Sequence, residues 1–371
     1  MIRILHFVSS VNVNSGVMSV LMNYYRHVNV NDIQFDFVYF TENETANYKT
    51  EILSRGGYCY LVAAPNHDPI GFEKDIHKLY KAHYGQWYAV HLHDTFLPAF
   101  LMDCKHMIGA KKLIAHAHLT SYGEIKAKAM RNYILSLPKY MIVDEFWACS
   151  HEAGYALAGK TTFERKGMIL NNAIKLDKFG FSKEERIRYR SNLGIDDCFV
   201  IGHVGHFSNQ KNHKFLVEVF KQVLKRKPSS KLVLIGEGTN RAMVEKQCEE
   251  AGISSNVLFL GVRKDVNSLL SMFDVFCFPS LYEGLPVSLI EAQAAGLPCA
   301  FSDTITREVN ILKLQNRVMS LDDSYDNWAE EVVSIGKEYD DPQQELRKAG
   351  FDIEVEANKI VGYYIDNIAS K

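Results

Sequence analysis

Short runs of β-branched and aromatic residues alternate with helical segments along most of this chain. In the first half, strand candidates lie at residues 2–8, 33–40, 58–63, 88–93, 112–118 and 144–150. A second series lies at residues 198–205, 231–238, 257–261, 275–280 and 297–302. Strands that alternate with helices form parallel sheets with right-handed crossovers. The two series therefore predict an α/β protein with two Rossmann-like domains.

The stretches between and after the two series predict the domain boundaries. Residues 171–196 are polar and charged, which indicates a linker followed by a helix. Residues 342–371 are expected to be helical, with apolar positions at Phe351, Ile353, Val355, Ile360, Val361, Tyr364 and Ile365. We predict an N-terminal domain over residues 1–175, a second domain over residues 176–352, and a helix over residues 353–371 that returns to the N-terminal domain and packs on the body.

The loops after the first strand of each series indicate where a ligand would bind. These loops are SSVNVNSG at residues 9–16 and GHVGHFSNQKN at residues 202–212. Open α/β sheets bind ligands beyond the carboxyl ends of their strands. We therefore expect the two domains to face each other and to hold the site in the cleft between them. Neither loop contains GxGxxG, which argues against an NAD-binding dehydrogenase.

Composition narrows the class further. The chain has 371 residues, of which 47% are hydrophobic and 23% charged, as in soluble globular proteins. Its formal net charge of −2 gives no reason to expect a nucleic-acid partner. Seven scattered cysteines without a CxxC pair favour reduced thiols over a disulfide scaffold or a zinc site. With no signal-peptide pattern and no run of ~18 apolar residues, a cytoplasmic protein is expected.

The segment SLYEGLPVSLIEAQAAGLPCA, residues 280–300, contains two glutamates on either side of a Gly-Leu-Pro turn. Pro286 suits a helix start and Gly296 a helix end, so we expect a helix over about residues 286–295. Glu283 then precedes the helix. Glu291 lies within it among apolar residues, where a carboxylate is costly unless it meets a hydrogen-bond donor.

One ligand would explain these features together. A helix N-terminus binds anions, so a nucleotide sugar would place its diphosphate there, its ribose near Glu291 and its sugar near Glu283. Lys211 is expected at another helix start, where it could bind phosphate as a point charge. The spacing fits equally well a surface turn with one glutamate and a second glutamate held by a structural arginine. Lys211 could likewise be a solvated lysine.

The order of these motifs resembles one family. GHFSNQKN, VLIGEG, LGVRKDV and FPSLYEGLPVSLIEAQAAGLP follow one another as in the retaining glycosyltransferases of family 4, which have the GT-B fold. GVMSVLMNYYRHV, IQFDFVYF, LIAHAH and NNAIKLDKF extend the likeness over nearly the whole chain, in particular to the bacterial exopolysaccharide and capsule branch. Glu283 and Glu291 match the strongest motif of that family.

The resemblance implies roles for individual residues. His118, Glu283 and Lys211 match residues at the reacting centre, where Glu283 contacts the donor sugar and Lys211 neutralises the diphosphate. Glu291 matches the residue that holds the ribose hydroxyls. The implied donor-binding residues are Gly16, His206, Lys211, Arg263, Glu283, Gly284, Leu285, Val287, Ser288 and Glu291. Within that set, Arg263 lies where the base is read, Gly16 belongs to a loop that closes over the phosphates, and residues 284–288, except Pro286, offer main-chain N–H groups.

The implied reaction moves a hexose or N-acetylhexosamine from a nucleotide donor, with UDP the expected carrier, to a polysaccharide or lipid-linked oligosaccharide. Retention would come from front-face attack. A helix start and a lysine would stabilise the leaving diphosphate, so no metal and no cofactor are expected, and no DxD motif is visible. Two departures are His206, where many relatives have arginine, and Ser15, where a second glycine is common. The alternatives are a GT-B nucleotide-sugar epimerase and a non-catalytic sugar-nucleotide sensor.

Two further features have competing interpretations. His91, His93, His116 and His118 lie at the ends of neighbouring strand candidates, so a metal cluster is conceivable. Without cysteines or regular ligand spacing, the preferred interpretation is polar residues at the edge of the cleft, with His118 functional. The segment KAKAMRNYILSLPKYMIV at residues 126–143 is basic and amphipathic. It suits either an ordinary surface helix or peripheral contact with anionic lipid at the inner face of the cell membrane.

Overall fold

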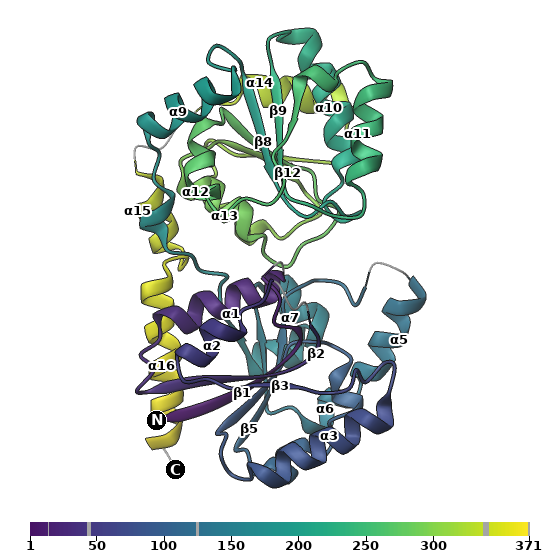
Figure 1. Ribbon diagram of the computed structural model, residues 1–371, viewed down its shortest axis with the longest axis vertical. Helices are drawn as coiled ribbons and strands as arrows, with labels where there is room; N and C mark the ends of the chain where they lie inside the picture. Colours follow the sequence, from purple (N-terminus) through teal and green to yellow (C-terminus); the bar gives the residue numbers. More distant parts are fainter. Residues whose placement is uncertain (14, 43–45, 124–125, 337–340, 370–371) are drawn as a thin grey trace. The chain divides into compact units, whose positions relative to one another are not determined.

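The chain folds into two compact units. The computed structural model describes all residues except 14, 43–45, 124–125, 337–340 and 370–371. Unit 1 comprises Met1–Ala173 and Ile353–Lys371, and unit 2 comprises Ile174–Asp352. Each unit is a parallel β-sheet with helices on its faces, so the predicted pair of Rossmann-like α/β domains is confirmed (Figure 1).

Unit 1 contains a seven-stranded parallel sheet in the order β3-β2-β1-β4-β5-β6-β7. Its strands are β1 (Ile2–Ser10), β2 (Ile33–Thr41), β3 (Cys59–Leu61), β4 (Ala89–Leu92), β5 (Lys112–Ala117), β6 (Glu145–Ala148) and β7 (Gly167–Ile169). The central strands are buried on both faces, which explains why they are recognisable as near-continuous apolar runs. The edge strand β7 was not predicted, because it lies in an apolar run of only three residues, 168–170.

Helices complete unit 1. They are α1 (Gly16–His27), α2 (Lys49–Ser54), α3 (Pro69–Ala82), α4 (Cys104–Ile108), α5 (Lys126–Ser136), α6 (Lys139–Ile142), α7 (His151–Ala158), α8 (Lys160–Lys166) and α16 (Ile353–Ala369), with a 3₁₀ turn at Leu97–Ala99. Helix α16 packs against α1 although more than 300 residues separate them in the sequence (Figure 1). None of the helices in the described ranges is long and apolar enough to cross a membrane.

Ser15, one of the two departures from the family pattern, lies at the start of α1. In the structure Ser15 is the N-cap of α1, with extended backbone (φ −79°), and its side chain accepts a hydrogen bond from the backbone N–H of Met18. A serine suits this position better than glycine does, because it satisfies one of the free N–H groups of the first turn.

Unit 2 contains a six-stranded parallel sheet in the order β10-β9-β8-β11-β12-β13. Its strands are β8 (Val200–Val204), β9 (Lys231–Ile235), β10 (Val257–Phe259), β11 (Val275–Phe278), β12 (Cys299–Ser302) and β13 (Arg317–Met319). Its α-helices are α9 (Lys183–Leu193), α10 (His213–Arg226), α11 (Arg241–Glu250), α12 (Val266–Leu269), α13 (Val287–Ala294), α14 (Tyr325–Ser334) and α15 (Pro342–Lys348). Only the short edge strand β13 was not predicted.

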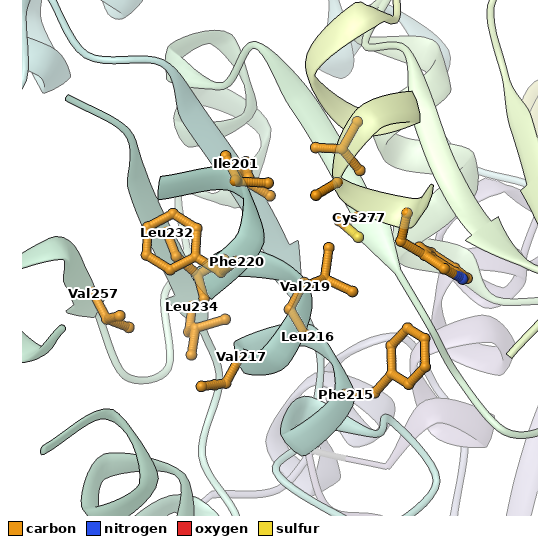
Figure 2. Packing of buried hydrophobic residues seen from close by; sticks show 14 of the residues in the cluster. Ile201, Phe215, Leu216, Val217, Val219, Phe220, Leu232, Leu234, Val257 and Cys277 are labelled. Carbon is orange, nitrogen blue, oxygen red and sulfur yellow. The ribbon is translucent and has the colours of Figure 1, made fainter. Parts of the chain in front are cut away.

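The core of unit 2 lies between helix α10 and the sheet. Buried residues of α10, such as Leu216 and Phe220, share one hydrophobic cluster with Leu232 and Leu234 of β9 (Figure 2). Trp328 of α14 belongs to the same cluster. Burying one such large apolar side chain contributes about 1.5–3 kcal/mol. This packing fixes the carboxyl end of β8, from which the loop that carries Lys211 departs.

The C-terminal tail contains two helices, and the second begins at Ile353, as predicted. Helix α15 ends at Lys348, and α16 begins at Ile353 after a break at Gly350, which has a positive φ of 84°. Two of the predicted apolar positions, Val355 and Ile365, are 46% and 44% exposed. The remaining buried face includes Ile353, Ile360 and Tyr364. Residues 370–371 of the predicted tail lie outside the described residues.

Candidate active site

Helix α13 begins one residue later than predicted, at Val287, with Pro286 as its N-cap. Pro286 has no N–H and makes no side-chain cap. The first N–H groups of a helix have no intrahelical acceptor, and the helix dipole adds positive potential at this end. The main chain at Val287 and Ser288 can therefore bind an anionic group, as helix starts bind phosphate in other proteins.

Glu283, in the loop before α13, forms an ion pair with Lys211. Lys211 Nζ lies 2.6 Å from Glu283 Oε1, and the two side chains are only 16% and 7% exposed. The ammonium group also lies 4.6 Å from the centroid of the Phe278 ring. The structure thus brings together two residues that lie 72 positions apart in the sequence.

The position of Lys211 differs from the prediction. It does not begin a helix, because α10 starts at His213 and its N-cap, Asn212, adopts a left-handed conformation with φ 54°. Gly205 makes room for the lysine. A Cβ atom on Gly205 would lie 3.3 Å from the Lys211 stem and 2.9 Å from His203 Nε2. The glycine and the left-handed turn together let the lysine side chain reach Glu283.

Glu291 lies inside α13 and is partly exposed. Burial raises the pKa of its carboxyl group to about 7. Among the described residues, no side chain forms an ion pair or hydrogen bond with this carboxylate, so the alternative of a structural arginine does not hold for the described part of the chain. A desolvated acid without a donor suits a ligand that supplies hydroxyl groups.

His206 and Arg263, both expected to contact the donor, have different surroundings. His206 is exposed in the loop after β8. Arg263 donates two hydrogen bonds to Asp265, and Tyr189 donates a third to the same carboxylate. The hydrogen bonds from Arg263 hold the pKa of Asp265 well below its usual range. Arg263 is therefore already engaged before any nucleoside base arrives.

Two of the expected residues belong to unit 1. Gly16 is the first residue of α1, and nothing lies within 4 Å of where its Cβ would be. His118 directly follows β5, and its Nε2 lies 2.8 Å from His93 Nδ1. Burial lowers the pKa of His118 to about 4, so its ring is neutral at pH 7.

The other histidines correct the prediction of polar residues at an edge. His91, His93 and His116 are buried inside unit 1, and burial lowers the pKa of each. A fourth buried histidine, His6, was not singled out, although it is paired in register with His91 on the neighbouring strand. A histidine in the middle of an apolar strand was the signal that could have identified it.

Comparison with known proteins places this arrangement in a family. Residues 185–351 match the family model described as "Glycosyl transferases group 1". Over 376 residues the chain is 32% identical to "Putative glycosyltransferase EpsF" of Bacillus subtilis (strain 168), covering 98% of this chain and 96% of that protein. The chain belongs to the group 1 glycosyltransferases. Lys211, Glu283 and Glu291 of this glycosyltransferase all lie inside the matched segment.

Other similarities of this glycosyltransferase are more local or more distant. Over 139 residues it is 31% identical to the UDP-Gal:alpha-D-GlcNAc-diphosphoundecaprenol alpha-1,3-galactosyltransferase of Escherichia coli, covering 36% of each chain. Its fold resembles that of HepE from Anabaena, solved in complex with UDP and glucose (TM-score 0.74, 15% identity, all of both chains). It also resembles sucrose-phosphate synthase from Thermosynechococcus elongatus (TM-score 0.77, 15% identity, all of both chains).

Proposed function

We propose that this glycosyltransferase moves a hexose or N-acetylhexosamine from a UDP-linked donor to a polysaccharide or lipid-linked oligosaccharide, with retention and without a metal in the transfer step. The observation that carries the proposal is the arrangement in unit 2. Glu283 of the Lys211–Glu283 pair lies in the loop directly before α13, and that helix holds Glu291, whose carboxylate has no partner among the described residues. The names of the HepE structure and of the Escherichia coli relative support UDP as the carrier.

The reaction requires positive charge or hydrogen-bond donors near the leaving diphosphate. Negative charge grows on it as the bond from C1 to oxygen breaks, and preorganised donors aimed at that charge lower the barrier. In our proposal Lys211 and the main-chain N–H groups of Gly284, Leu285, Val287 and Ser288 supply them. Glu283 holds the lysine in place before the donor binds and then accepts a hydrogen bond from a hydroxyl of the donor sugar.

Glu291 determines how the nucleoside is held. As a carboxylate it can accept hydrogen bonds from two neighbouring ribose hydroxyls. These hydroxyls would supply the donors that no described residue gives it. Burial disfavours the charged form of Glu291, and binding of the ribose would favour it. Arg263, already paired with Asp265, would contact the base through its stem and backbone, and His206 and Gly16 would lie near the phosphates.

Retention in a family 4 enzyme would follow from front-face attack. The acceptor hydroxyl approaches C1 on the face from which the diphosphate departs, and a phosphate oxygen takes its proton. No protein nucleophile is needed, which agrees with the assignment of Glu283 to lysine and sugar contacts. His118, with a neutral ring held by His93, would contact the reacting sugar as a hydrogen-bonding group.

A lipid-linked acceptor would require contact with a membrane, and helix α5 offers a surface for it. Met130, Tyr133 and Ile134 of α5, with Leu137 directly after it, form an exposed apolar face at helical spacing. Lys126, Lys128 and Arg131 of the same helix are also exposed. An anionic lipid surface matches both the charge and the apolar face.

Lys139 does not belong to this basic surface, which corrects the prediction from the sequence. It is buried, and its ammonium group donates a hydrogen bond to Ser136 Oγ at 2.8 Å. Burial lowers its pKa to about 8. The predicted segment at residues 126–143 is also two helices, α5 and α6, rather than one.

The test of the proposed function is product analysis with UDP-sugars and a lipid-linked glycan acceptor. Transfer of the sugar to the acceptor, with the α-anomer of the donor retained in the product by NMR, is the expected result. Release of UDP with an epimerised free sugar and no acceptor product would instead identify an epimerase. Donor binding without turnover would identify a sensor. The Lys211→Met variant serves as the inactive control.

A further inference from the structure

Five histidines gather on one face of the sheet of unit 1. His6 lies on β1, His91 on β4 and His116 on β5, while His93 and His118 directly follow β4 and β5. His6 is paired with His91, and the register of β4 with β5 brings His93 beside His116. Because side chains alternate between the faces of a strand, all five share one face. The cluster replaces the aliphatic residues that normally fill a parallel sheet.

Several ring nitrogens of this cluster lack partners among the described residues. These are His6 Nε2, His91 Nδ1, His118 Nδ1 and both ring nitrogens of His116. His116 is only 3% exposed. An unsatisfied buried polar group costs about 1–3 kcal/mol, so five in one cluster indicate that something absent from the chain itself satisfies part of them.

We infer that His93, His116 and His118 bind a transition-metal ion of the Zn²⁺ class. One nitrogen of each ring lies within 4.8 Å of the others. Imidazole nitrogens are preferred ligands of such ions, and a set of three histidines leaves a fourth position for water. His118 is partly exposed, which gives the ion access from solvent.

The distances suit an ion with little rearrangement. His93 Nδ1 and His118 Nε2 are 2.8 Å apart and point at one another. Ligand nitrogens around a tetrahedral Zn²⁺ ion lie about 3.3 Å apart, given metal–nitrogen bonds of about 2.0–2.1 Å. Small rotations of the two rings would open the required space and exchange one hydrogen bond for two metal–nitrogen bonds.

His6 would accept the hydrogen bond that a metal-binding histidine usually donates from its other ring nitrogen. Its Nδ1 lies 3.0 Å from His93 Nε2. With His93 Nδ1 on the metal, His93 Nε2 carries the proton and donates it to His6 Nδ1, which fixes the tautomer and the ring orientation. His6, His91 and His93 form a second compact triad, but all three are buried, so an ion there would have no access from solvent.

A small cavity next to the cluster raises the alternative that a water molecule, rather than a metal ion, satisfies the histidine nitrogens. His6, His91 and His116 line a cavity of about 10 Å³ together with Leu21 and Tyr24. Such a volume holds about one water molecule, which could satisfy some of the free nitrogens. If water alone satisfies the cluster, titration should show no specific Zn²⁺ binding, whereas a metal site should bind one ion per chain.

The test is titration of the chelator-treated, full-length protein with Zn²⁺ by calorimetry and with Co²⁺ by optical absorption. One ion per chain and the absorption bands of tetrahedral Co²⁺ are expected. His116→Gln and His118→Ala should each weaken Zn²⁺ binding on the order of 100-fold, and His6→Phe about 10–100-fold. His118 is partly exposed, so the second variant remains informative if His116→Gln fails to fold.

The matched controls are His77→Gln and His106→Gln, which remove exposed histidines of the same unit and should leave binding unchanged. Absence of Zn²⁺ binding by the wild-type protein would overturn the inference. So would binding that persists in both His116→Gln and His118→Ala. Both readouts are independent of sugar transfer, and the three ligands lie in a different unit from Lys211, Glu283 and Glu291, so failure here leaves the proposed function intact.

Discussion

Lys211 Nζ and Glu283 Oε1 are 2.6 Å apart in a largely buried ion pair that connects the loop after β8 with the loop before α13. In the free protein each charge compensates the other. A bound diphosphate would give Lys211 a second anionic partner, and a donor sugar would give Glu283 hydroxyl groups. The pair therefore keeps both side chains in position for a ligand that carries both groups.

Removing Lys211 should reduce both stability and nucleotide affinity. Lys211→Met removes the cation that pairs with the buried Glu283 carboxylate, so the free energy of unfolding should fall by about 2–4 kcal/mol. The affinity for UDP should fall about 10–100-fold, because a charged donor to the diphosphate is lost. Urea unfolding and calorimetric titration measure the two effects. Lys214→Met, which removes an exposed lysine nearby on α10, should change neither.

The double variant Lys211→Met/Glu283→Leu separates these effects. Replacing both charges removes the uncompensated carboxylate, so most of the lost stability should return while UDP binding stays weak. Recovery of UDP affinity along with stability would mean that Lys211 acts only through the fold, and the phosphate assignment would be wrong.

Glu291 should make stability depend on pH. Its pKa is about 7 in the folded protein and about 4.3 in the unfolded chain, so the folded state binds the proton more tightly. The stability from this group is fully present below pH 4.3 and is lost as the pH rises through 7. Glu291→Gln should therefore stabilise the protein at pH 8 by about 1–3 kcal/mol and much less at pH 5. Thermal unfolding at both pH values checks this, and an equal shift at the two would contradict it.

Transfer should not require a divalent ion. Lys211 and the start of α13 provide the positive potential at the diphosphate, so EDTA should change the initial rate by less than about twofold. Because the histidine site of unit 1 would also respond to a chelator, the control is His116→Gln. Loss of activity in EDTA that Mg²⁺ or Mn²⁺ restores, in both proteins, would refute the lysine-and-helix account.

Helix α5 should bind anionic vesicles. Lys126→Gln/Lys128→Gln should weaken binding to phosphatidylglycerol vesicles about 30-fold, because each charge near the surface contributes about 1 kcal/mol. Ile134→Ser should weaken it further through the apolar face. Cosedimentation measures both, with phosphatidylcholine vesicles as the lipid control. Ile187→Ser, at an exposed position of unit 2, should have no effect, and an equal loss there would argue against a specific surface.

Much of the fold could be predicted because buried parallel strands are long apolar runs. Eleven strand candidates correspond to strands in the structure, from β1 to β6 and from β8 to β12. The two missed strands, β7 and β13, have three residues each and lie at sheet edges. The equally short edge strands β3 and β10 were predicted because each lies in a longer aromatic or apolar run, at residues 58–63 and 257–261, whereas β7 and β13 lie in no such run.

The candidate site was predicted less completely, for a different reason. The helix at Val287 and the position of Glu291 within it follow from local sequence. The Lys211–Glu283 pair depends on two loops 72 residues apart, which local sequence cannot place together, and on the left-handed backbone of Asn212. The histidine cluster likewise depends on strand order, since only the pairing of β1 with β4 brings His6 to His91.

The most direct test of the donor site is calorimetric titration with UDP of the wild-type protein, Glu291→Ala and Glu283→Ala, with exposed Glu249→Ala as the control. Glu291→Ala should lose about 1.5–3 kcal/mol of binding free energy, as for hydrogen bonds to a charged group. Glu283→Ala should keep near-normal UDP affinity, since Lys211 remains, yet lose turnover with the intact donor. Equal losses of UDP affinity in both variants, or no loss in Glu291→Ala, would contradict the division of roles between the two glutamates.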